Sequence, residues 1–159
     1  MMVSRDAAFG ILMSAAVGTL FFVPAHGSAQ DSLSVSCADV YSRSPLEDLT
    51  RCVEQGHAGA QSALGLKYAS GAGVPEDDVE AVRWYRLGTA QGLALAQYNL
   101  GYMYASGLGV PVDQAEAVRL YRLAAEQGLA LGQNNLGLMY ASGLGVPVDQ
   151  AEAVRWYRL

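Results

Sequence analysis

The sequence is poor in the residues from which enzyme and metal sites are commonly built. Its 159 residues include two cysteines and two histidines, and they contain no run of like charges. The formal net charge of −5 argues against a general nucleic-acid or anionic-membrane binder, because such proteins carry a basic footprint. Proline is scarce outside turns, and no low-complexity linker is present. The apolar fraction of 52% is sufficient for one folded domain with a buried core.

Motifs of common catalytic sites are also missing. A nucleophilic triad needs a base beside a serine or cysteine, and His57 is the only histidine beyond the N-terminal leader. Its place beside Gly56 is typical of an exposed turn histidine. Asp77 and Asp78 are paired carboxylates, but they lie where a helix begins and are interpreted as solvated caps. Neither a phosphate loop nor the Ser-x-x-Lys of penicillin-recognising enzymes occurs. We therefore predict a protein that is not an enzyme and needs no cofactor or metal.

The first 29 residues have the layout of a secretory signal peptide. Arg5 precedes the apolar run AAFGILMSAAVGTLFFV at 7–23, and small residues suited to cleavage follow Pro24, ending at either 27 or 29. An uncleaved membrane anchor is the alternative, because this run approaches the length of a short transmembrane span. We expect export to the periplasm or the medium, with no other membrane association.

Export affects the interpretation of the two cysteines. In an oxidising compartment, Cys37 and Cys52 most simply form a disulfide. Closing a loop of this size stabilises a fold by roughly 3 kcal/mol in the chain-entropy model. A metal site would need two further ligands, and only His57 lies nearby.

The rest of the chain repeats with a period of 36 residues. Three copies occupy 58–93, 94–129 and 130–159, the last one shortened. The first two copies agree at 23 of 36 positions, and the last two agree at 26 of the 30 that can be compared. The stretch MYASGLGVPVDQAEAVR occurs unchanged at 103–119 and 139–155. Such a period indicates supersecondary units that stack.

Each copy contains the patterns of two helices. In the second copy, a first helix over about 94–105 has one apolar face and ends at Gly107, which is suited to a left-handed cap. Asp113 caps the second helix, and Glu116 completes an acidic variant of the capping box. Gly101 and Gly137 lie inside first helices, where glycine costs about 1 kcal/mol relative to alanine, so we expect close helix packing there.

The repeat resembles a known family. Its pattern is A-x-A-Q-x-x-L-G-x-M-Y-x-x-G-x-G-V-x-x-D-x-x-E-A-x-x-x-Y-x-x-A-A-E-Q-G, which over 58–159 resembles the Sel1-like repeat, a relative of the tetratricopeptide repeat. The resemblance implies an all-α fold, a right-handed α/α solenoid of helical hairpins that serves as a scaffold for protein–protein interaction. Exported bacterial members often act in envelope signalling or in contact with other cells. The first copy departs from the pattern at Lys67, where methionine is expected.

Two further departures concern the ends of the stack. The cysteine-rich branch of the family pairs its cysteines within each hairpin, whereas here the one pair precedes the first full repeat. We therefore predict that Cys37 and Cys52 staple an N-terminal cap, residues 30–57, and hold a helix near 45–55 onto the stack. The third copy stops inside its second helix, so we expect further repeats beyond Leu159 or another protein at that edge.

Positions that differ between otherwise similar copies are the best candidates for a binding surface. On the first helices they have spacings of three, four and seven, which place them on one face, displaced from the core. They are Leu95, Tyr98, Asn99 and Tyr102, and Leu131, Asn134, Asn135 and Leu138. In such solenoids the first helices line the concave groove, and tyrosine with asparagine suits an extended peptide. Ordinary exposed or inter-repeat packing positions are the alternative interpretation.

These observations predict an exported scaffold that binds a protein or peptide partner in the groove. Two alternatives stay open: an enzyme that binds or hydrolyses β-lactams, as claimed for cysteine-rich relatives, and a structural element that oligomerises through its C-terminal edge. Arginines such as Arg83, Arg119 and Arg155 recur on the second helices, where they form either a basic ladder or, as we favour, a solvated face with i,i+3 ion pairs.

Overall fold

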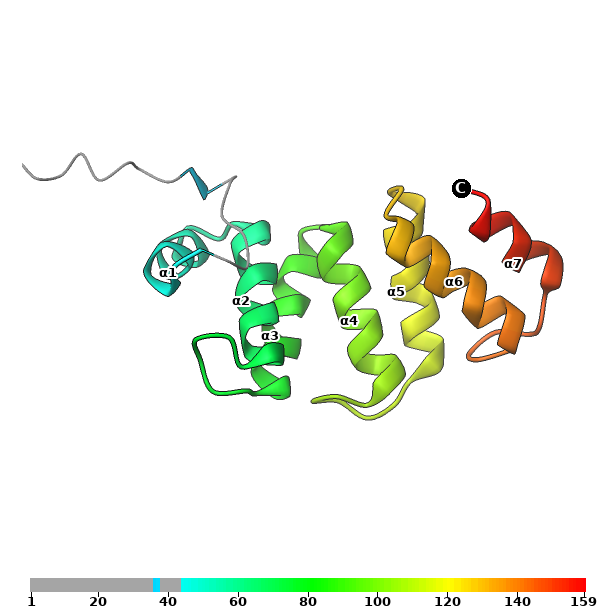
Figure 1. The fold of residues 1–159 in the computed structure, drawn as a ribbon, viewed down its shortest axis with the longest axis horizontal. Helices are drawn as coiled ribbons and strands as arrows, with labels where there is room; N and C mark the ends of the chain where they lie inside the picture. The colour runs from blue at the N-terminus through cyan, green and yellow to red at the C-terminus, as the bar shows by residue number, and fades with distance from the viewer. Residues whose placement is uncertain (1–35, 38–43) are drawn as a thin grey trace, which may run out of the picture. The chain divides into compact units, whose positions relative to one another are not determined.

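The computed structural model describes residues 36–37 and 44–159, and within them the chain forms seven α-helices and no strand (Figure 1). The helices are α1 (Leu46–Glu54), α2 (Ala58–Ser70), α3 (Asp78–Ala90), α4 (Ala94–Ser106), α5 (Gln114–Glu126), α6 (Ala130–Ser142) and α7 (Gln150–Tyr157). None of these helices is both long and apolar enough to cross a membrane. The predicted signal peptide, 1–29, lies outside the described residues and stays a prediction.

The helices pack as successive hairpins. Helix α2 pairs with α3, α4 with α5, and α6 with α7, while α3 contacts α4 and α5 contacts α6. Figure 1 shows the row that results, from α1 at one end to α7 at the other. Helix α2 also contacts α4 directly, so the first helices of the first two repeats lie side by side. The predicted all-α solenoid of helical hairpins is confirmed.

Glycine ends each first helix as the sequence predicts. Gly107 follows α4 with a φ of 72°, and its N–H donates to the carbonyl of Met103 at 2.9 Å. Gly71 and Gly143 end α2 and α6 in the same left-handed conformation. A residue without a Cβ adopts this conformation without steric cost, which is why glycine is the common choice at a helix C-terminus.

The restart of the second helix follows the prediction in one half only. The Asp113 carboxylate accepts a hydrogen bond from the Glu116 N–H at 2.9 Å, as a cap should. The reciprocal half of the predicted capping box is wrong, because the Glu116 side chain binds Arg119 instead. The Asp113 N–H is already satisfied, since it donates to the carbonyl of Tyr104 at 3.0 Å. This bond crosses the joint, the segment between the two helices of a repeat, which is 107–113 in the second repeat. The joint thus ties the two helices of a hairpin through their backbones.

The core lies between the two helices of each hairpin and between neighbouring hairpins. Its members are apolar residues of both helix types, among them Ala81, Val82, Tyr85, Leu100, Met103, Ala117, Val118, Leu120, Tyr121, Leu136 and Met139. A Cβ on Gly101 would lie 3.0 Å from the ring of Tyr121, and one on Gly137 would lie 2.7 Å from Tyr157. The expected close approach at both glycines is confirmed.

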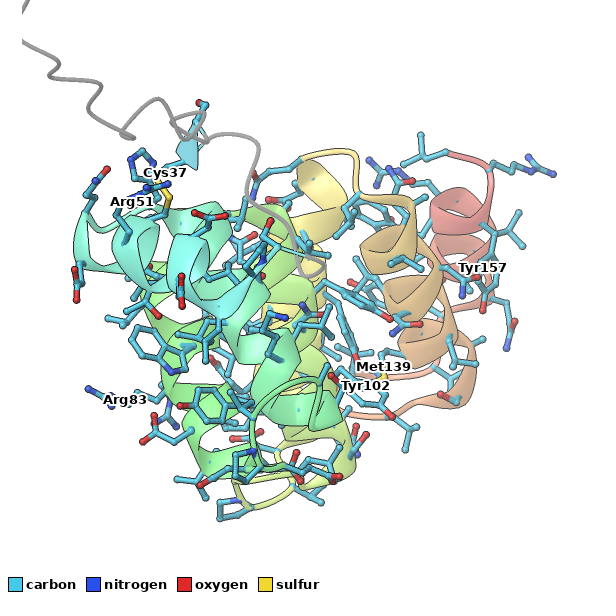
Figure 2. The ribbon with its side chains drawn as sticks, turned by 60° about the vertical axis from the view of Figure 1, so that its left-hand side comes forward. Cys37, Arg51, Arg83, Tyr102, Met139 and Tyr157 are labelled. Carbon is cyan, nitrogen blue, oxygen red and sulfur yellow. A yellow bond between two sulfur atoms is a disulfide. The ribbon has the colours of Figure 1, made fainter. Side chains whose placement is uncertain are left out.

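The predicted N-terminal cap, 30–57, lies partly outside the described residues and stays a prediction, but its helix α1 resembles a shortened second helix. Cys37 and Cys52 form the predicted disulfide, with a Cα–Cα distance of 5.4 Å, and Figure 2 shows it beside α1, at the far end of the stack from Tyr157. Cys52 and Leu49 are fully buried and pack with the start of α2. Leu49 stands 36 residues before Tyr85, and Cys52 stands 36 before Gly88. The α1 helix therefore covers the first repeat as α3 covers the second.

Neighbouring repeats also meet where both have very small residues. At the α3–α4 contact, a Cβ on Gly88 would lie 2.8 Å from the Cβ of Ala96. At the equivalent α5–α6 contact the two residues are exchanged, and a Cβ on Gly132 would lie 2.9 Å from that of Ala124. Each contact therefore accommodates one methyl group. The first helix α4 supplies it through Ala96 at one contact, and the second helix α5 supplies it through Ala124 at the other.

Candidate functional site

The predicted binding face is exposed and apolar. Leu95, Tyr102, Leu131 and Leu138 are each between 44% and 53% exposed, although they are large apolar side chains. Leu66 of α2 continues the row, at 40% exposure and in the register of Tyr102 and Leu138. The structure thus places these residues at the surface of the first helices, away from the core.

Most of the polar residues in the predicted set are less exposed than the apolar ones. Tyr98 is partly buried, and its ring centroid lies 5.8 Å from that of Tyr121 in the core. Asn99 and Asn135 are also partly buried, whereas Asn134 is exposed. Burial raises the pKa of the Tyr121 phenol to about 12, and a hydrogen bond with Asn135 opposes that rise. Tyr98 therefore also contributes to packing within the second repeat, and Asn135 to packing between the second and third repeats.

A hollow of about 370 Å³ lies between α2, α3, α4 and the joint that follows α4. Three predicted residues line it: Tyr98, Asn99 and Tyr102, the last of which is labelled in Figure 2. The other lining residues are Leu66, Ala69, Ser70, Asp78, Tyr85, Met103 and Leu108. The volume is near the lower end of the range for small-molecule sites. The hollow therefore suits one side chain of a partner.

Predicted residues of the third repeat are not brought to this hollow. Asn134 lines a smaller hollow of about 120 Å³ near α7, together with Gln133, Trp156, Tyr157 and others. The eight predicted residues all lie on α4 and α6, but of these eight only Tyr98, Asn99 and Tyr102 line the larger hollow, and only Asn134 lines the smaller one. The hollow between the first and second repeats is the larger of the two, and more of the predicted residues line it.

Sequence reasoning missed the part that Asp78 takes in the hollow. Asp77, and not Asp78, caps α3, because its carboxylate accepts hydrogen bonds from the N–H groups of Val79 and Glu80, each at 3.0 Å. Asp78 is the first residue of the helix, and it is partly buried in the wall of the hollow. The signal was present in the repeat, because the other two copies have glutamine at this position.

The recurring arginines are paired within the chain. Arg83, Arg119 and Arg155 each form an ion pair with the glutamate three residues earlier, at 2.7–3.2 Å. The hydrogen bonds that Arg119 donates to the Glu116 carboxylate raise the pKa of Arg119 above its ordinary value. Arg86 and Arg122 donate to the hydroxyl groups of tyrosines in the next repeat. These contacts support the predicted solvated face over a basic ladder.

The described residues offer no group of histidine, cysteine, aspartate and glutamate side chains that is placed to hold a metal ion. His57 precedes α2 as its N-cap residue, is exposed, and makes no side-chain cap hydrogen bond. The features that this surface offers a ligand are shape, aromatic rings, apolar area and one carboxylate.

Comparison with known protein families recovers the three repeats that the sequence shows. A model of the Sel1 repeat family matches residues 58–93, 94–129 and 130–159. No curated protein sequence matches the chain.

Two solved structures are similar. One is a protective antigen present in uropathogenic Escherichia coli strains, described as displaying an SLR fold, with 47% identity and a TM-score of 0.69 over 70% of this chain and 24% of that one. The other is a Sel1 repeat protein from Oxalobacter formigenes, with 39% identity and a TM-score of 0.66 over 70% of this chain and 45% of that one. The chain thus spans less than half of either relative.

Proposed function

Because this chain belongs to the Sel1 repeat family, whose members typically act as protein-interaction scaffolds, we propose that it binds a segment of a partner protein on its first helices. The observation that carries this proposal is the row formed by Leu66, Tyr102 and Leu138. These residues occupy one register in three successive repeats and are 40%, 49% and 53% exposed. Contiguous exposed apolar area is typical of interaction sites.

The row favours an extended or helical polypeptide over a small molecule. It runs across three stacked helices, so a ligand must follow the stack to contact all of it. Tyr102 supplies aromatic area, and Asn99 and Asn134 supply amide groups for hydrogen bonds at its margins. Tyrosine and asparagine are enriched in surfaces that recognise proteins through rigid rings and adaptable polar contacts.

An exported location is part of the proposal. The N-terminal segment has the layout of a signal peptide, and the Cys37–Cys52 disulfide is a bond that persists in oxidising compartments. One structural relative is a protective antigen, which supports a place in or beyond the bacterial envelope. We propose the periplasm or the medium as its location.

Site-specific photo-crosslinking tests the binding face. A photoreactive residue replaces Tyr102 in one variant, and in the matched control it replaces Leu87, which is similarly exposed, at 42%, but belongs to second helix α3. In living cells we expect a defined crosslinked species from position 102 and none from position 87. The same species from both positions, or none from 102 in a folded protein, would contradict the assignment of the face.

A further inference from the structure

The joint of the first repeat lacks a hydrogen-bond donor that the other two joints have. In the second repeat the Gln114 amide donates to the carbonyl of Ala105 at 3.0 Å, and in the third Gln150 donates to Ala141 at 3.2 Å. The equivalent pair in the first repeat is Asp78 and Ala69. An ionised carboxylate has no N–H or O–H to donate, so the Ala69 carbonyl cannot receive this bond. In the first joint the Asp78 carboxylate and the Ala69 carbonyl are both acceptors, whereas each later joint pairs a glutamine donor with a carbonyl acceptor.

Both acceptor residues line the hollow between α2, α3 and α4. The ten residues that surround it include Asp78 and Ala69 but no lysine, arginine or histidine. The ion pairs found among the described residues all involve other carboxylates, so Asp78 has no internal cation. Its charge also acts on the Tyr85 phenol in the same wall, whose pKa burial raises to about 12 with a further contribution from Asp78. The hollow therefore has one negative charge with no paired cation among the described residues, offset only by the partial positive charge at the start of α3.

Aromatic and apolar groups form the rest of the wall. Tyr98 and Tyr102 project from successive turns of α4, while Leu66 and Met103 supply aliphatic surface. A cation over the face of a tyrosine is attracted to the ring, and the interaction strengthens when water is excluded. The side chain that best satisfies such a wall has a flexible apolar stem and a planar cationic head with several N–H donors, which describes arginine.

We propose that this hollow binds an arginine side chain of the partner, with its guanidinium directed to Asp78 and the Ala69 carbonyl, and its stem between Tyr98 and Tyr102. The inference rests on the proposed function, since it names the residue by which the partner is held on the first helices. The net charge of −5 favours a basic partner segment as well.

The equivalent position between the second and third repeats provides an internal comparison. There the residues in the register of Asp78, Tyr98 and Tyr102 are Gln114, Asn134 and Leu138. The carboxylate and both of these rings are absent, and the Gln114 amide satisfies the local carbonyl. We expect no preference for a cation at this second position, so recognition of arginine is confined to one end of the row.

An NMR titration of the full chain tests the proposal. The probe is N-acetyl-arginine amide, and N-acetyl-citrulline amide is the control, because it has nearly the same shape and no charge. We expect saturable shifts of backbone amides around residues 78 and 102, with an arginine dissociation constant on the order of 1–10 mM and a citrulline constant at least about tenfold higher. Equal shifts with both probes, or no saturation by arginine, would overturn the inference.

Variants taken from the other repeats keep the test independent of folding. Asp78→Gln and Tyr102→Leu introduce the residues found at the same places in the third repeat, so both variants should fold. We expect Asp78→Gln to weaken arginine binding at least about tenfold and to restore the joint hydrogen bond. Gln114→Asp, in the second joint, should leave the shifts around residue 78 unchanged. Undiminished binding by Asp78→Gln would refute the role of the carboxylate.

The outcomes of this test and of the crosslinking test distinguish the arginine inference from the proposed function. If crosslinking through position 102 succeeds while arginine and citrulline bind alike, the proposed binding face stands and the arginine inference falls. If crosslinking fails in a folded protein, the proposed function falls, whatever the small probe does.

Discussion

Gly73 and Gly109 occupy the same position in the joints of the first and second repeats, but they have different neighbours. Both have a positive φ, 85° and 66°. A Cβ on Gly73 would meet nothing within 4 Å, whereas one on Gly109 would overlap the backbone of Asp78 and Val79 at the start of α3. Gly145 is likewise set against the start of α5, at Gln114 and Ala115. Among the described residues, the turn at the first joint thus makes no close contact through this glycine, whereas the turns at the two later joints contact the start of the preceding second helix.

This comparison shows how a repeated sequence acquires different roles. The turn residues specify a local conformation in all three joints. Whether that conformation also builds an interface depends on whether the start of a preceding second helix reaches the turn. Helix α3 begins at Asp78, whereas α1 begins at Leu46, four residues later in the register of the repeat. Single substitutions separate these two contributions.

Gly109→Ala should destabilise the protein more than any other substitution considered, with Gly73→Ala as its matched control. A side chain at positive φ costs about 1–2 kcal/mol at either position. Only at Gly109 does the new Cβ also meet backbone, which adds an overpacking cost of about 1–3 kcal/mol. Urea unfolding followed by circular dichroism measures the difference, and Gly145→Ala should behave like Gly109→Ala. Equal losses at Gly73 and Gly109 would mean that the second joint does not rest on α3.

Removal of the disulfide should have the next largest effect, and a local one. Replacing Cys37 by serine and Cys52 by alanine should lower the free energy of unfolding by about 3 kcal/mol, because the staple no longer restricts the unfolded chain. In a repeat array each unit contacts only its neighbours, so the loss should be concentrated in α1 and α2. Hydrogen exchange measures this distribution, and reduction of the unmodified protein is the control. Equal loss of protection in α6 would contradict a local role.

The exchange of small residues between repeats predicts a rescue. Gly88→Ala should destabilise by about 1–3 kcal/mol, because its Cβ would lie 2.8 Å from that of Ala96. Adding Ala96→Gly recreates the arrangement that the chain already uses at Ala124 and Gly132, so the double variant should recover most of the loss. Thermal or urea unfolding of the single and double variants measures the coupling. If the losses of stability in the two single variants simply added in the double variant, the side chains at 88 and 96 would not compete for the same volume.

Local features of the fold were predictable from the sequence. Helix ends at Gly107 and helix starts at Asp113 follow from the conformational freedom of glycine and the capping strength of aspartate, which act within a few residues. The core positions of α4 and α5 follow from a period of 3.6, and the disulfide follows from two cysteines in a chain expected to be exported. The repeat itself made the stack predictable, because one hairpin cannot bury its own apolar face.

Features that depend on distant residues were not predictable. Glu116 was assigned to the Asp113 N–H, but the carbonyl of Tyr104 occupies that donor once the joint closes. Tyr98 and Asn135 were placed on the binding face, and only the packing of α4 and α6 against α5 shows that both also contact Tyr121. The place of Asp78 in the hollow likewise requires knowing that α4 and its joint close the space beside it.

The exchanged small residues at the repeat contacts have a consequence for how such genes can change length. Deleting one period, residues 94–129, would set Gly88 against Gly132 and leave a contact short of a methyl group. Duplicating the same period would set Ala124 against a second Ala96, with one methyl group too many for separations of 2.8–2.9 Å. Recombination across the identical stretches 103–119 and 139–155 would instead remove or duplicate Ala124 and Gly132 together, so each remaining contact would keep one methyl group. A gain or loss of a unit therefore preserves these contacts when its boundaries fall between the two helices of a hairpin, whereas boundaries between hairpins require a compensating substitution.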